Sequence, residues 1–183
     1  MKSLTGKLLV AAPQLNDPNF SQSVVLMIQH EPQGAFGVVL NRPSDKTVSD
    51  VWELIGKEPC GIDQLVHIGG PVPGPLLALH TLDSASDQEV LPGLHVTGQE
   101  SAFETLVEHS DSQYRFFSGH SGWAGGQLEG ELKASGWLSC DAQVEDVFSD
   151  YETLWKRVTS RIGLQIIAPD IRPEHIPEDP GLN

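Results

Sequence analysis

The segment "FFSGHSGWAGGQLEGE", Phe116 to Glu131, sets a serine between glycines with a histidine beside it. The residues "YRFFSG" at its start are rich in aromatic side chains and predict a strand. A glycine-rich run then leads into a polar segment. Because a serine at the end of a strand can act as a nucleophile, Ser121 raises the first question about function.

Ser121 fits a hydrolase only in part. The nucleophile elbow G-x-S-x-G needs small residues on both sides of the serine, and here Trp123 occupies the fifth position. The segment "HIGGP" lacks the third glycine of an oxyanion loop, and Pro71 has no N–H to donate. A hydrolase-like enzyme that uses Ser121, with His120 or His67 as base, is therefore the alternative function. We expect that Ser121 is not an activated nucleophile.

Strand signals recur on both sides of this segment. "SQSVVLMIQHE" and "AFGVVLNRP" predict a hairpin across the turn "EPQG", with Pro43 ending the second strand. Shorter strands are expected in the segments "LLVAA", "QLVHIGGP", "PLLALHTL", "LHVTG" and "SGWLSC".

Capping and stop signals predict three helices. They are a short helix capped by Thr47 or Ser49 and ended by Gly56, a helix opened by Ser101 and Glu104, and a helix opened by Ser149 and Glu152 and ended by Gly163. The irregular alternation of strands and helices predicts a single α+β domain over residues 1–168, with a mixed or antiparallel sheet. Residues 169–183 read as a Pro-rich, acidic tail.

The charge of the chain argues against nucleic acid as a partner. Eleven Lys and Arg face 25 Asp and Glu, which gives a net charge of −14 with neutral histidines. Because duplex DNA is held largely through cations on phosphate, direct DNA binding is not expected. The best basic patch, Lys156, Arg157 and Arg161, is more simply a set of solvated cations near a helix end.

The remaining composition excludes several classes of site. The apolar run Leu8–Ala12 is too short for an export signal, and no stretch is long enough to span a membrane. Cys60 and Cys140 lie far apart, and neither a metal-binding nor a phosphate-loop motif occurs. We therefore expect a cytoplasmic protein that binds no metal and no cofactor.

Several blocks of the chain resemble a known family. "LTGKLLVAAPQLNDPNFSQSVVLMIQH", "GAFGVVLNRP", "HIGGPV", "FFSGHSGWAGGQLEGEL", "GWLSCDAQVEDVF" and "LWKRV" are similar to signature blocks of the AlgH/YqgE family of bacterial proteins, from Leu4 to about Gly163. One departure is His120, where an aromatic residue is frequent. The resemblance implies one cytosolic α+β domain in which a small closed, barrel-like sheet is flanked by helices.

The resemblance implies no reaction, and no catalytic or ligand-binding residues of the family carry over. Some relatives bear the label of transcriptional regulator. With the acidic charge and no helix-turn-helix pattern, that label favours an indirect role. The leading expectation is a noncatalytic binding or regulatory protein that acts through an unknown protein partner or a small polar or anionic ligand.

The elements N-R-P, G-G-P and G-x-S-G-W of the sequence have two interpretations. Their glycines and prolines either serve turn geometry or gather into one pocket at strand ends. In the pocket interpretation, Arg42, Ser121 and Gln127 offer hydrogen bonds and Trp123 forms an apolar wall. The candidate binding residues are then Asn41, Arg42, Gly69, Gly70, Pro71, Gly119, Ser121, Trp123 and Gln127.

Overall fold

The computed structural model describes residues 2–109 and 111–167, and the acidic tail expected over residues 169–183 lies outside this part of the chain. Ten strands form one sheet. They are β1 (Lys7–Ala11), β2 (Val24–Glu31), β3 (Gly34–Val39), β4 (Pro43–Thr47), β5 (Leu65–Ile68), β6 (Val72–His80), β7 (Gln88–Leu91), β8 (Leu94–Thr97), β9 (Tyr114–Ala124) and β10 (Trp137–Asp141).

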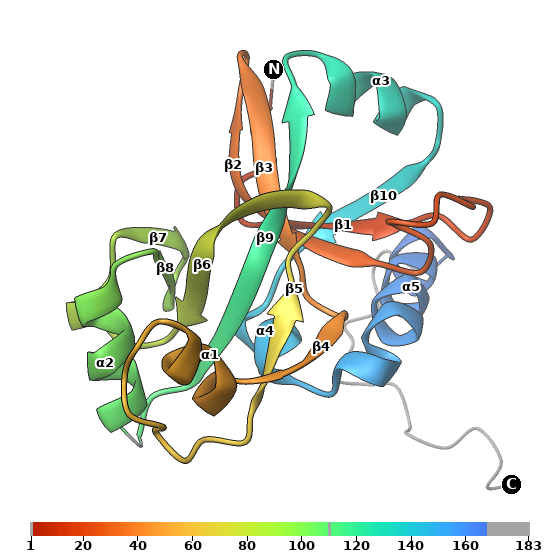
Figure 1. The fold of residues 1–183 in the computed structure, drawn as a ribbon. Helices are drawn as coiled ribbons and strands as arrows, with labels where there is room; N and C mark the ends of the chain where they lie inside the picture. The colour runs from red at the N-terminus through yellow and green to blue at the C-terminus, as the bar shows by residue number, and fades with distance from the viewer. Residues whose placement is uncertain (1, 110, 168–183) are drawn as a thin grey trace, which may run out of the picture.

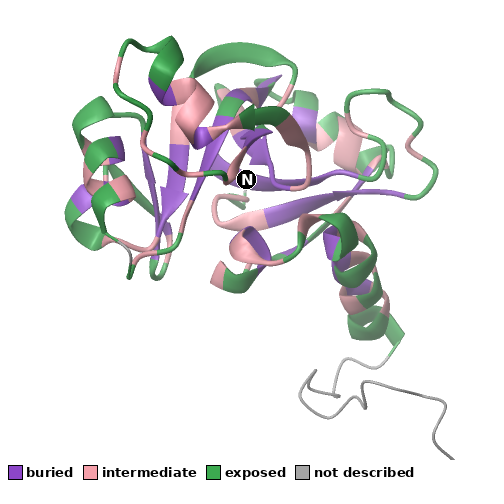
Figure 2. Cartoon of the chain, turned by 60° about the horizontal axis from the view of Figure 1, so that its bottom comes forward, coloured by how far each residue is buried: buried purple, intermediate pink, exposed green. Residues whose placement is uncertain are grey.

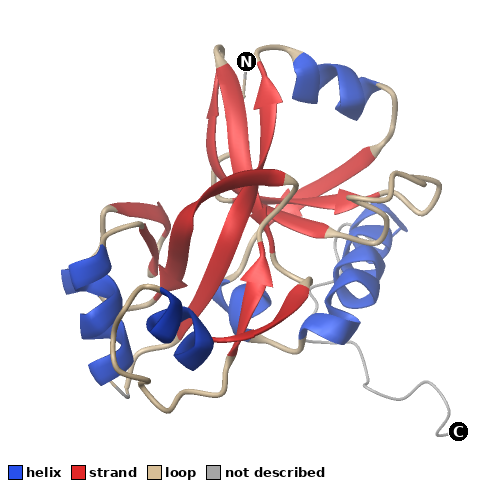
Figure 3. Cartoon of the chain, viewed as in Figure 1, coloured by secondary structure: helices blue, strands red, loops and turns tan. Residues whose placement is uncertain are grey.

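The helices of the described residues lie around this sheet (Figure 3). They are α1 (Val48–Leu54), the 3-10 helix η1 (Asp83–Ala85), α2 (Glu100–Glu108), α3 (Gln127–Lys133), α4 (Val144–Phe148) and α5 (Tyr151–Ile167).

Strand β9 is the centre of the sheet, and it carries the serine segment (Figure 1). Its first half pairs with β6 antiparallel on one side and with β5 parallel on the other. Its second half pairs with β3 antiparallel. The strand therefore runs on through "GHSGWA", where the sequence predicts a turn, because both halves find backbone partners. Gly119, at φ +69°, bends the strand between the two halves.

The predicted hairpin is confirmed, since β2 and β3 pair antiparallel across Pro32 and Gln33. The expected shorter strands correspond to β1, β5, β6, β8 and β10. Pro43 does not close the second strand of the hairpin. It opens β4 instead, and the first residue of a strand is a place where a missing N–H costs least.

The sheet is strongly curled but does not close. The strand order is β10-β1-β2-β3-β9-β6-β8-β7, and β7 and β10 at its two ends do not pair within the described residues. Among the described residues one hydrogen bond joins β7 and β2, from Gln88 Nε2 to the Ile28 carbonyl at 3.3 Å, and Val90 packs in the same apolar cluster as Ile28. The expected closed barrel is thus corrected to a half-barrel, in which side-chain packing rather than a ladder bridges the open edge.

Three apolar clusters hold the layers together (Figure 2). The largest lies inside the curl of the sheet, around Phe117, and is covered by α4 and α5. A second packs α3 against the outer face of β1, β2 and β3. The third packs α1, α2 and η1 against β6 and β9, around Phe116. Both faces of β9 are therefore buried at these consecutive phenylalanines.

Helix boundaries depart from the capping signals in two places. Thr47 caps α1 as expected, with a complete capping box. Gln99 precedes α2 without a side-chain cap, so the expected box at Ser101 is wrong. At α5, Asp150 instead of Ser149 accepts from the Glu152 amide, at 3.0 Å. That helix also continues through Gly163 to Ile167.

Candidate functional site

Ser121 is fully buried in β9, and its hydroxyl forms a hydrogen bond with a backbone carbonyl. Its Oγ donates to the Gly69 carbonyl at 3.1 Å. The same carbonyl accepts from the Val39 amide at 2.8 Å. The hydroxyl therefore helps to fasten the segment after β5 between β3 and β9.

Asn41 and Arg42 lie beside this junction, just after β3. The Asn41 side chain accepts from the Val24 amide and donates to the Gln22 carbonyl, both at 2.9 Å. Arg42 donates from Nη2 to the Ser21 carbonyl at 3.1 Å. Both side chains thus hold the segment that leads into β2.

Gly70 and Gly119 allow two backbone segments to touch. A Cβ atom at Gly70 would lie 2.4 Å from the backbone of His120, and one at Gly119 would lie 2.8 Å from the Val72 carbonyl oxygen. Both residues also have positive φ, at +153° and +69°. Close approach and backbone conformation explain these glycines. Pro71, next to them, is exposed.

Trp123 and Gln127 belong to a different set of contacts, around Glu131. The Glu131 carboxylate accepts from the indole N–H of Trp123 at 3.0 Å, from that of Trp137 at 2.9 Å, and from the Gln127 amide at 2.9 Å. Phe20 stacks on Trp123 with ring centroids 6.1 Å apart.

The candidate residues therefore form two groups. Asn41, Arg42, Gly69–Pro71, Gly119 and Ser121 meet where β3, β5 and β9 adjoin, whereas Trp123 and Gln127 lie with α3. In the described chain, no hydrogen bond joins the two groups. None of these residues lines either of the cavities described next.

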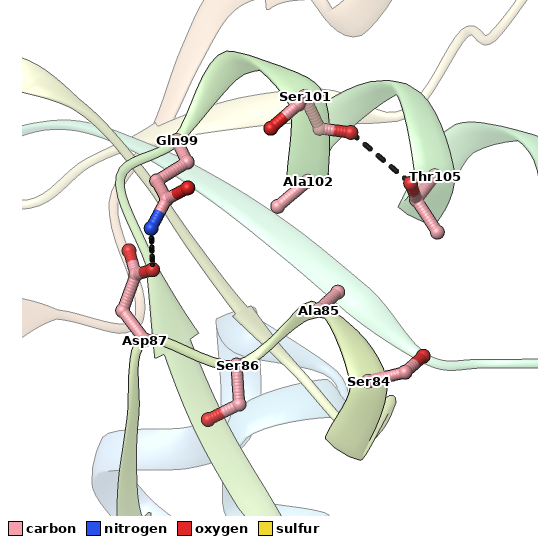
Figure 4. A pocket seen from close by; sticks show the side chains of 8 residues that line it. All are labelled: Ser84, Ala85, Ser86, Asp87, Gln99, Ser101, Ala102 and Thr105. Carbon is pink, nitrogen blue, oxygen red and sulfur yellow. Dashed lines mark hydrogen bonds between the residues drawn. The ribbon is translucent and has the colours of Figure 1, made fainter.

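A polar cavity of about 210 Å³ separates η1 from the start of α2 (Figure 4). Ser84, Ser86, Asp87 and Ser101 are among the residues that line it, and the Ser86 hydroxyl lies 3.0 Å from His95 Nδ1. Asp87 already accepts from the Gly98 amide, the Thr97 hydroxyl and the Gln99 amide group. These three bonds hold the pKa of Asp87 below its usual range. The Asp87 carboxylate thus holds the loop before α2 in place through these hydrogen bonds.

Arg115, near the start of β9, is a buried charged residue whose hydrogen bonds are incomplete. Its side chain is only 7% exposed, and it shares the inner face of the strand with Phe117. Nη2 donates to the Ser149 carbonyl at 3.3 Å, while Nη1 is buried and has no hydrogen-bond partner within residues 2–109 and 111–167. No carboxylate of these residues forms an ion pair with Arg115.

Asp150, an acid whose charge acts on Arg115, makes its hydrogen bonds elsewhere. Its carboxylate accepts from the Glu152 amide at 3.0 Å and the Thr153 hydroxyl at 2.8 Å, which caps α5. Burial lowers the pKa of Arg115, although the charges of Tyr151 and Asp150 oppose this shift. The guanidinium is thus a buried cation without a carboxylate in contact.

Arg115 lines a cavity of about 290 Å³, which we call the Arg115 cavity. Its walls are Gln64, Ser112, Gln113, Tyr114, Arg115 and Phe148. They come from the approach to β5, the start of β9 and the end of α4, where α4 lies behind the two strands in Figure 1. Among these six residues Arg115 is the one that carries a charge, so the cavity is locally cationic in an acidic chain.

His67, on β5, shares a face of the sheet with Arg115 but is not one of the six residues that line the Arg115 cavity. It pairs with Phe117 in the parallel ladder and is 2% exposed. Its ring meets that of Tyr151 edge-on, with centroids 5.2 Å apart. Burial, then the charge of Arg115, lower the pKa of His67 to about 4. The ring is therefore neutral at physiological pH.

Sequence reasoning missed Arg115, although a signal was present. In "YRFFSG" the side chains of Arg115 and Phe117 share one face of the strand, and Tyr114 and Phe116 share the other. Aromatic residues on both faces indicate a strand buried on both sides. A cation in such a strand stands at a core position, where arginine is rare unless it is paired.

Two further observations concern metal-binding groups and membrane-spanning helices. Among the described residues, no three His, Cys, Asp or Glu side chains are grouped so as to hold a metal ion. No helix in the described part of the chain is long and apolar enough to cross a membrane.

Comparison with known proteins gives a consistent relationship. The family model described as AlgH-like matches residues 8–167. A UPF0301 protein of Chlorobaculum tepidum is 38% identical, with 97% of this chain and 95% of that protein covered. A UPF0301 protein of Streptomyces avermitilis is 36% identical, with 100% and 97% covered.

Solved structures agree. The solution structure of the AlgH protein from Pseudomonas aeruginosa matches with a TM-score of 0.74 and 27% identity, over 93% of this chain and 96% of that one. The crystal structure of protein DIP2367 from Corynebacterium diphtheriae matches with a TM-score of 0.73 and 27% identity, over 88% and 87%. The chain therefore belongs to the AlgH-like family.

Proposed function

We propose that this AlgH-like chain is a noncatalytic binding protein of the cytoplasm, and that its ligand is a small anion held by Arg115. One observation carries the proposal: Arg115 is among the residues that line a cavity, and its buried Nη1 has no hydrogen-bond partner among the described residues. An anionic ligand would supply the partner that this cation lacks.

The energetic argument is that an unpaired buried charge is expensive. Removing an ion from water costs several kcal/mol even after the protein relaxes, and a paired carboxylate or phosphate oxygen recovers part of that cost. A guanidinium also presents planar donors that match such oxygens. Burial of Arg115 therefore lowers the free energy of unfolding, and binding of an anion would recover part of this loss.

The cavity indicates the size of the ligand. At about 290 Å³ it lies at the lower end of the range for small-molecule sites, so it suits a compact metabolite rather than a nucleotide or a peptide. Gln64, Ser112 and Gln113 add neutral hydrogen-bonding groups, and Phe148 adds an apolar wall.

A regulatory role fits this site if it is indirect. A net charge of −14 opposes contact with a duplex, whereas a bound metabolite can alter how the protein meets a protein partner. The free thiols of Cys60 and Cys140 suit the reducing cytoplasm. A hydrolase that uses Ser121 is disfavoured, because that hydroxyl is buried and donates to a backbone carbonyl.

Backbone amide NMR tests the proposal with two probes, sodium butyrate and inorganic phosphate. Each is titrated into ¹⁵N-labelled protein at constant ionic strength, with sodium chloride as the reference. We expect saturable shifts at Gln113, Arg115 and Ser149 with at least one probe, because these amides lie at or beside the Arg115 cavity. A dissociation constant of about 1 mM or tighter corresponds to about 4 kcal/mol of binding free energy.

Two variants complete this experiment. Arg115→Met keeps most of the side-chain volume and removes the charge, so its shifts should not saturate. Lys156→Met removes the same charge from an exposed position and should bind like the wild type. Equal binding by Arg115→Met and the wild type, or saturation by neither probe in the wild type, would contradict the proposal.

A further inference from the structure

A groove of about 460 Å³ lies between α1, the loop that follows it and α2, which pack in the same apolar cluster (Figure 1). We call it the α1–α2 groove. Trp52, Cys60 and Val107 form the apolar part of its lining. Ile55, three residues after Trp52 at the end of α1, is 49% exposed. Apolar side chains at an open groove are typical of a site that binds another molecule.

The charged part of this lining is mostly acidic. It consists of Glu58, Glu104 and Glu108 and one cation, Lys57. Lys57 Nζ is already paired with the carboxylate of Glu100, at 2.7 Å, and with that of Glu104. Among the described residues, no cation forms an ion pair with Glu58 or Glu108. Within this part of the chain, two carboxylates of the groove therefore have no counter-charge in contact.

Glu108 occupies a position that disfavours a carboxylate. Glu100, Glu104 and Glu108 recur every four residues, so they share one face of α2 and repel one another. Glu108 is also the last residue of α2, where the helix macrodipole is negative and the last turn holds no basic residue. Residues that break local rules of stability in this way often serve binding. A cation from another molecule would offset both unfavourable interactions.

We propose that the α1–α2 groove is a docking site for a segment of a partner protein that presents an arginine between apolar side chains. The guanidinium binds Glu58 and Glu108, and its aliphatic stem packs on Trp52 and Val107. Arginine also stacks on indole rings, and both residue types are enriched among those that contribute most to binding at interfaces.

Two observations favour a basic protein segment over other occupants. Because Ile55 is exposed but does not line the groove, a ligand that covers both must be larger than one amino acid. A second copy of this chain is disfavoured, because each copy has a net charge of −14 and the groove is itself acidic.

Synthetic peptides test the docking site by NMR. The probe is acetyl-Ser-Leu-Arg-Leu-Ser-amide, and the matched peptide carries citrulline, which keeps the shape of arginine without its charge. Each is titrated into the ¹⁵N-labelled full chain. We expect the arginine peptide to shift the Trp52 indole N–H and the Val107 and Ile55 amides saturably, with a Kd of about 1 mM or tighter. The citrulline peptide and arginine amide should each bind at least about tenfold more weakly.

Charge variants assign this binding to the groove. Glu58→Gln/Glu108→Gln should weaken binding of the arginine peptide at least about tenfold and leave that of the citrulline peptide unchanged. Glu145→Gln/Glu152→Gln makes the same change in net charge at exposed positions of α4 and α5, and should bind like the wild type. Because the groove variant relieves repulsion along α2, its Tm should be no lower than that of the wild type.

The results distinguish the occupants. Preference for the arginine peptide that is lost in the groove variant alone would support the proposal. Equal binding of both peptides, an equal loss in both double variants, or a lower Tm of the groove variant would overturn it. Arginine amide that binds as tightly as the peptide would replace the protein segment by a small cation, and absence of saturable shifts would exclude the docking site. The anion site is tested separately, because the α1–α2 groove and the Arg115 cavity share no lining residue.

Discussion

Replacing Arg115 by methionine should stabilise the ligand-free protein, which is the reverse of the usual effect of a buried substitution. Among the described residues the guanidinium makes one hydrogen bond, to the Ser149 carbonyl, and at 3.3 Å it is long. Its loss should cost about 1.5 kcal/mol, the low end for a charged donor. Removing a buried cation without a carboxylate partner returns several kcal/mol. The net expectation is about 2 kcal/mol of added stability.

Differential scanning calorimetry measures this effect. For a chain of 183 residues, about 2 kcal/mol corresponds to a rise of about 4 to 8 °C in Tm. Lys156→Met should leave Tm within about 2 °C, since an exposed substitution changes stability little. Addition of the anion that binds the wild type should raise the Tm of wild type and Lys156→Met, but not that of Arg115→Met.

A fall in Tm on replacing Arg115 would refute this reasoning. It would mean that the guanidinium stabilises the junction of α4 and α5 by more than its burial costs. In that case Arg115 would be a structural residue, and there would be no reason to expect an anion in the cavity beside it.

Other predictions concern the rest of the fold. Arg161→Ala should destabilise the protein by about 3 kcal/mol in urea denaturation, because it leaves buried Asp146 without its two-bond ion pair. Stability should fall as pH drops from 6.5 towards 4: the folded pKa values of His67 and His80 are lowered to about 4, so the unfolded chain binds more protons in this window. Each ring contributes at most about 3 kcal/mol, measured by urea denaturation at each pH. Titration against a library of genomic fragments at physiological salt should give no saturable, site-specific binding to duplex DNA.

Local sequence signals predict those elements whose partners lie close along the chain. The hairpin of β2 and β3 follows from two apolar runs and a four-residue turn. The capping box at Thr47 is read from neighbouring residues alone. By contrast, the length of β9 depends on three partner strands, and no local pattern shows that a glycine inside it bends a strand rather than ends one.

The functional residues illustrate the same limit. Glycine-rich motifs predict a pocket at Gly70 and Gly119. In the structure these glycines lack a Cβ atom where two backbone segments touch. Arg115 stands in no motif, and its importance depends on which groups surround it. Alternation along "YRFFSG" places it on an apolar face, but only the positions of Ser149 and Asp150 show that it lacks a carboxylate.

The pairing of β1 has a consequence for synthesis of the chain. Lys7–Ala11 binds β2 on one side and β10 on the other, in the register Lys7 to Asp141. On the ribosome, the second neighbour emerges more than a hundred residues after the first strand is complete. Until then the apolar edge of β1 is open to strands of other nascent chains. The β1–β2 pair therefore forms before its third strand exists. A nascent chain arrested before β10 exposes unpaired backbone groups along β1, which β10 covers in the complete fold.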